Sequence, residues 1–196
     1  YDYTQWFTLN HSETISYTIT LNGQPVASIV SAGTYSITLT VEETNYYNEL
    51  VEHVDVEVSK ATYTPIVPTG LTAIFGDKYS SVAIANPAGN KAGTWTINSE
   101  ELIKQVGEVK VNATFTPTDT NYIASENEVS INVGRKTITI NVADLVTTYN
   151  TQAQYLTYTL EGLVEGVVTP EVTGNTGLTN AGSKEFTLVV DNEYYT

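Results

Sequence analysis

A set of short motifs that returns at a nearly constant interval constrains the fold of this chain more than any other feature. A glycine that follows a small residue or valine opens an alternating segment at Gly33, Gly107 and Gly182. The tripeptide Thr-Asn-Tyr follows the first two of these segments and ends at Tyr46 and Tyr122. The interval between these two tripeptides almost equals the interval between the first two glycines. Because a fixed period indicates tandem units, the sequence predicts a repeat protein.

A third mark, a lysine that closes the last strand of a unit, defines the expected boundaries. Lys60 and Lys136 are separated by the same interval as the two tyrosines, which predicts units at 1–60, 61–136 and 137–196. The central unit is complete, whereas the first is incomplete at its N-terminus and the third at its C-terminus. No linker rich in proline, glycine or serine separates the units, so we expect them to form an extended, fairly stiff rod.

Apolar and polar residues alternate within the units, as expected for strands with one buried and one solvated face. The clearest examples are residues 35–41, 54–58, 109–115, 129–133 and 186–190. No segment keeps an apolar stripe of helical period for three turns. The sequence therefore predicts an all-β chain.

Further short strands separated by turn signals favour a sandwich. Asn22-Gly23 is the strongest hairpin signal in the chain and follows an alternating segment. Similar segments follow Gly93, begin near Ile138, and run over residues 156–160. The predicted fold is thus a series of immunoglobulin-like β-sandwich repeats.

The motifs resemble those of a known group of repeats. Residues 32–35, 44–46 and 54–61 resemble bacterial immunoglobulin-like surface-protein repeats of the MBG and Big classes. The third unit resembles the MBG class in particular, through residues 155–166 and 180–182. The resemblance covers nearly the whole chain. It implies a place outside the bacterial cell, in large secreted or wall-attached proteins and adhesins, and it implies no chemistry.

Charge and composition exclude several classes of partner. Eight lysines and arginines against 22 aspartates and glutamates give a net charge of −14, which disfavours nucleic acid and anionic membranes. The absence of cysteine excludes disulfides and thiolate metal sites, and no apolar run reaches the ~18 residues of a membrane span. Because the chain begins with Tyr1 and contains no methionine, we expect it to be processed or part of a longer protein.

The candidate functional residues are mostly structural. The three repeated glycines are expected at turns with positive φ, and Tyr46 and Tyr122 are expected to cap one end of each sandwich, although a platform for sugars is an alternative. Tyr47, Tyr194 and Tyr195 are possible ligand contacts if they cluster at the surface.

No catalytic, cofactor-binding or metal-ligating residue is predicted, so the chain is not expected to be an enzyme. His53 and Asp55 share a polar strand face but are too few for a metal site. Calcium at a unit junction is a weaker possibility, through Asp77, Asp119 or Asp144. Crosslinks between lysine and asparagine stay open, because no spacing selects a pair.

These observations favour a structural spacer or stalk segment of a large bacterial cell-surface or secreted adhesin-like protein. Its main partners would be the neighbouring repeats of the same polypeptide. One alternative is an adhesive module that binds a host glycan or protein. Another is a fibre subunit that self-assembles by strand exchange, because the two outer units are incomplete.

Overall fold

The computed structural model describes residues 15–43 and 48–196 of the chain. Apart from one short 3-10 turn, η2 (Tyr79–Ser81), every regular element in these residues is a β-strand. The prediction of an all-β chain is confirmed. Among the described residues, no helix is long and apolar enough to cross a membrane.

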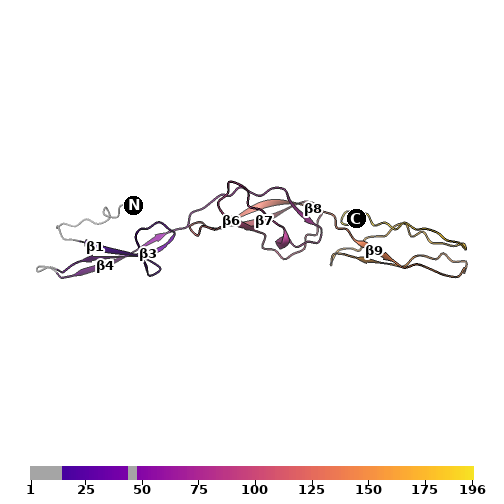
Figure 1. Ribbon diagram of the computed structural model, residues 1–196, viewed down its shortest axis with the longest axis horizontal. Helices are drawn as coiled ribbons and strands as arrows, with labels where there is room; N and C mark the ends of the chain where they lie inside the picture. The colour runs from indigo at the N-terminus through magenta and orange to yellow at the C-terminus, as the bar shows by residue number, and fades with distance from the viewer. Residues whose placement is uncertain (1–14, 44–47) are drawn as a thin grey trace. The chain divides into compact units, whose positions relative to one another are not determined.

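The strands form three sheets (Figure 1). By its contacts, the chain divides into two compact units. Of the described residues, one unit comprises 15–43, 48–65, 91–93 and 116–125, and the other comprises 66–90, 94–115 and 126–196. Each sheet lies within one of the three repeats expected from the sequence. The repeat boundaries themselves stay a prediction.

The first sheet is antiparallel, with the order β2-β1-β3-β4. Its strands are β1 (Ile15–Leu21), β2 (Gln24–Val26), β3 (Gly33–Val41) and β4 (Leu50–Val58). Asn22 and Gly23 join β1 to β2 with φ of 51° and 77°, and Leu21 pairs with Gln24. Positive φ at both central residues matches the right-handed twist of a hairpin, so the predicted turn is confirmed. The core consists of Ile19, Tyr35 and Ile37.

The middle sheet has the order β5-β8-β7-β6, and Phe115, Val129, Ile131 and Val133 of its strands are fully buried. Its strands are β5 (Leu71–Ile74), β6 (Gly93–Thr96), β7 (Gly107–Pro117) and β8 (Ser125–Gly134). β5 pairs with β8 in parallel, with Leu71 opposite Ile131. The rings of Trp95 and Phe115 pack with their centroids 5.2 Å apart, which anchors the core of this sheet.

The third sheet contains only β9 (Thr139–Val142) and β10 (Tyr158–Glu161), paired antiparallel. β10 begins later than predicted, because the side chain of Asn175 bonds the backbone N–H and carbonyl of Leu156 at 3.0 and 2.9 Å. The prediction of a continuous strand at residues 186–190 was wrong. This segment makes one isolated bridge, between Val189 and Thr173, and no described segment pairs with the rest of it.

Candidate functional site at the asparagine–tyrosine turns

The turn that carries Tyr122 is closed by its own side chains. The carboxylate of Asp119 accepts hydrogen bonds from the backbone and side-chain nitrogens of Asn121 at 2.9 and 2.8 Å. The side-chain oxygen of Asn121 then accepts a 2.6 Å bond from the backbone N–H of Ala32. Ala61 forms a parallel bridge with Tyr122 and donates its N–H to the carbonyl of Asn121 at 2.7 Å. The turn therefore holds together three segments that are far apart in sequence.

Tyr122 also belongs to a half-buried cluster with Tyr63 and Lys91. The Lys91 ammonium lies 4.2 Å from the centroid of the Tyr122 ring and 5.7 Å from that of Tyr63. A side-chain hydrogen bond with Tyr122 raises the pKa of Lys91 above its ordinary value, which favours the charged ammonium. Because a cation already covers the Tyr122 ring, this arrangement favours the capping role over a sugar platform.

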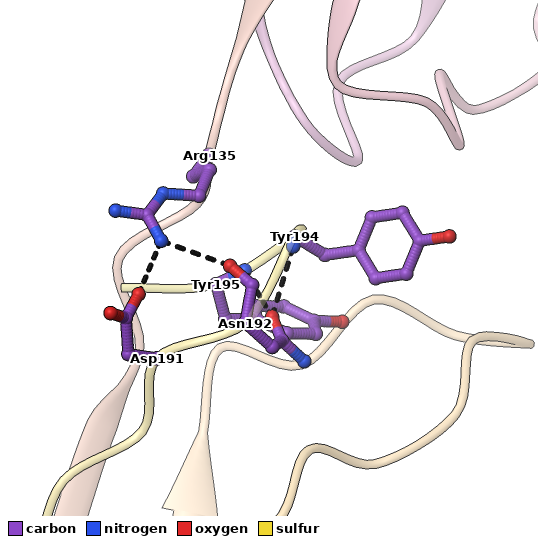
Figure 2. Close-up of polar contacts among 5 residues, drawn as sticks. All are labelled: Arg135, Asp191, Asn192, Tyr194 and Tyr195. Atoms are coloured by element: carbon purple, nitrogen blue, oxygen red, sulfur yellow. Dashed lines mark hydrogen bonds and ion pairs between the residues drawn. The ribbon is translucent and has the colours of Figure 1, made fainter.

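A second turn of the same kind lies at residues 191–195 (Figure 2). The side-chain oxygen of Asn192 accepts bonds from the backbone N–H groups of Tyr194 and Tyr195 at 2.9 and 2.8 Å. The guanidinium of Arg135 donates to the carboxylate of Asp191 and, at 2.9 Å, to the carbonyl of Asn192. Arg135 follows β8 directly, so the end of the middle sheet is tied to this turn.

The two turns make the same backbone bridge. Tyr122 pairs in parallel with Ala61, and Tyr195 pairs in parallel with Lys136. The sequence marks align Lys136 with Lys60, whereas the bridges align Lys136 with Ala61, so this alignment shifts by one position. Backbone pairing defines the equivalent positions, and a lysine next to the paired position does not.

Tyr195 does not lie at the surface, which was the condition for its being a possible ligand contact. Tyr195 is 0% exposed, its hydroxyl accepts a 3.0 Å bond from the N–H of Val164, and its ring meets Phe75 edge-on at 5.4 Å. Tyr194 is half-buried and stacks on Phe75 at 4.8 Å, and a hydrogen bond with Glu193 raises its pKa. Both rings serve packing because Phe75, far away in sequence, provides the surface that covers them.

The residues that complete these turns could not be predicted from the sequence. Phe75, Lys91 and Arg135 carry no repeated motif, so their role emerges only from the contacts. Tyr46 and Tyr47 lie outside the described residues, and the structure says nothing of them.

The repeated glycines all have positive φ. Gly33 and Gly107 have φ of 151° and 98°, and they begin β3 and β7. Gly182 has φ of 142° and begins no strand. At Gly33, a Cβ atom would lie 2.7 Å from the side chain of Leu21, so close packing adds to the backbone requirement.

The candidate polar groups are engaged locally. His53 Nδ1 lies 3.0 Å from the hydroxyl of Thr38 across the exposed face of the first sheet. The Asp77 carboxylate accepts a backbone N–H bond within its own turn, Asp119 lies in the Tyr122 turn, and Asp144 is exposed. Within residues 15–43 and 48–196, no group of three or more histidine, aspartate or glutamate side chains could hold a metal ion.

Comparisons with protein-family models, curated proteins and solved structures found no match. Each turn joins a backbone bridge to a packed aromatic ring, an arrangement that resists separation of the joined segments.

Proposed function

We propose that the chain is a series of immunoglobulin-like β-sandwich repeats that acts as a non-catalytic spacer or stalk at the bacterial cell surface. The resemblance to MBG and Big repeats suggests this setting. The observation that carries the proposal is the recurrence of one parallel bridge, at Ala61–Tyr122 and at Lys136–Tyr195. The same pairing in both places supports two repeats, at 61–136 and 137–196, with the same strand arrangement.

The connections between strands and bridges are short. Only Ser59 and Lys60 separate the end of β4 at Val58 from the bridge at Ala61, and only Arg135 separates the end of β8 from the bridge at Lys136. Such connections leave little freedom for hinge motion. A spacer needs this property, because a flexible chain would not hold another domain at a fixed distance.

Side-chain contacts add to the restraint at each connection. The Ala32–Asn121 hydrogen bond reinforces one turn, and the contacts of Arg135 with Asp191 and Asn192 reinforce the other. The net charge of −14 would keep neighbouring copies apart on a crowded surface.

Light scattering combined with small-angle X-ray scattering tests the proposal. A spacer is expected to be a 21.4 kDa monomer with a radius of gyration well above the ~16 Å of a compact chain of this length. Arg135→Gln removes the contacts to the 191–195 turn and should broaden the distribution of interatomic distances. Lys110→Gln makes the same charge change but breaks only an ion pair with Glu128 inside the middle sheet, so it should leave the distribution unchanged.

A radius of gyration near ~16 Å would contradict the spacer function. Polymers that grow with protein concentration would instead favour the strand-exchange fibre. The adhesive alternative loses one of its supports because Tyr195 is buried.

A further inference from the structure

Two tyrosine rings from distant segments meet in the cluster of Tyr63, Lys91 and Tyr122. The centroids of the two rings lie 6.2 Å apart with an angle of 75° between the ring planes, so the edge of one ring faces the other. All three residues belong to the same compact unit, and each is partly accessible from solvent. The pair therefore combines close contact between two phenols with access to reagents in solution.

Backbone bonds hold the two tyrosines near each other. Ala61 pairs in parallel with Tyr122, donates its N–H to the carbonyl of Asn121 at 2.7 Å, and accepts a 3.0 Å bond from the N–H of Ile123. Tyr63 lies two residues after Ala61 on the same segment, so this pairing restricts its position relative to Tyr122. Two groups held in this way react without first having to find each other in solution.

Lys91 contacts both tyrosines. Its backbone N–H donates a 3.1 Å hydrogen bond to the hydroxyl of Tyr63, and its ammonium lies 4.2 Å from the centroid of the Tyr122 ring and 5.7 Å from that of Tyr63. These contacts reduce the number of rotamers open to each ring. Lys91 is thus a positioning residue for the pair.

We propose that Tyr63 and Tyr122 are a site of dityrosine formation, with hydrogen peroxide as the oxidant and a haem peroxidase as the one-electron catalyst. Each phenol loses one electron and its hydroxyl proton, and the two phenoxyl radicals form a carbon–carbon bond between the ring positions next to the hydroxyls. The hydrogens on these two carbons then move to the oxygens as the rings become aromatic again. In all, two electrons and two protons leave the pair and reduce one peroxide molecule to two molecules of water.

The bond would tie the segment that begins at Ala61 covalently to the turn that carries Tyr122. It would close a loop of about 60 residues, which restricts the unfolded chain, in a sequence that has no cysteine for a disulfide. The proposal rests on the geometry of the tyrosine pair and does not require the spacer function.

Oxidation of the full chain by a haem peroxidase and hydrogen peroxide tests the proposal. At about 1 µM protein, the two held tyrosines are about 1,000 times more concentrated with respect to each other than tyrosines of different molecules, so the product should be a crosslinked monomer. Mass spectrometry of its proteolytic fragments should find the fragments of Tyr63 and Tyr122 joined with the loss of two hydrogen atoms. The crosslinked monomer should also unfold at a urea concentration about 1–2 M higher than the untreated chain.

Variants show whether the folded arrangement directs the reaction. Tyr63→Phe and Tyr122→Phe should each abolish the joined fragment, because the coupling needs both phenols. Tyr79→Phe is the matched control, since Tyr79 is also half-buried but belongs to the other compact unit, and it should leave the yield unchanged. Lys91→Met should lower the yield, and Lys91→Arg should restore it by placing a cation over the rings again. Absence of the joined fragment, an equal yield from the chain unfolded in urea, or its formation only in dimers would overturn the proposal.

Discussion

The hydroxyl of Tyr195 offers the sharpest test of the buried turn. It accepts a 3.0 Å hydrogen bond from the N–H of Val164, and both residues are buried. Tyr195→Phe keeps the ring and its packing against Phe75 but leaves that N–H without its acceptor. A buried donor without a partner costs about 1–3 kcal/mol, so the free energy of unfolding should fall by this amount. With a urea m-value of about 2 kcal/mol/M, the unfolding midpoint should move down by about 0.5–1.5 M.

Amide hydrogen exchange measures the same bond directly. The N–H of Val164 should exchange about 5- to 150-fold faster in Tyr195→Phe than in the parent chain. Tyr194→Phe is the matched control, because it removes the hydroxyl of a half-buried ring and keeps the stack on Phe75, so its effect should stay within about 0.5 kcal/mol. Unchanged exchange at Val164 in the Tyr195 variant would refute the reasoning, since water would then satisfy the donor.

Three further predictions use stability, titration and solubility. In urea unfolding, Gly76→Ala should lower the free energy of unfolding more than Gly70→Ala. Both glycines have positive φ, but only at Gly76 would a Cβ collide with the side chain of Val164. Equal decreases in the free energy of unfolding would contradict the contact. The hydrogen bond with Lys78 lowers the pKa of Glu100 below its ordinary value of 4.5, so the stability of this pair is present above pH 4.5 and lost as the pH falls through the lowered pKa. In Lys78→Met, an NMR titration should show the Glu100 midpoint rising toward 4.5, and an unmoved midpoint would exclude the pair as its cause. Light scattering should show stronger attraction between molecules near the sequence pI of about 4.3 than at pH 7, and equal interaction at both would exclude charge repulsion.

The sequence predicted what depends on neighbouring residues. The Asn22-Gly23 hairpin follows from the backbone preferences of two residues, and the shared face of Val129 and Ile131 follows from alternation within one strand. It could not predict the burial of Tyr195, because the ring that covers it belongs to a segment far away in the chain. The lysine mark also gave a misleading register, since backbone pairing, and not the lysine side chain, defines the equivalent positions.

Alternation fixes which side chains share a face, but a neighbouring strand decides whether that face is buried. β4 and β8 have the same pattern, yet Val54 of β4 is 38% exposed and Val129 of β8 is 1% exposed. β4 lies at the edge of its sheet, whereas β8 lies between β5 and β7.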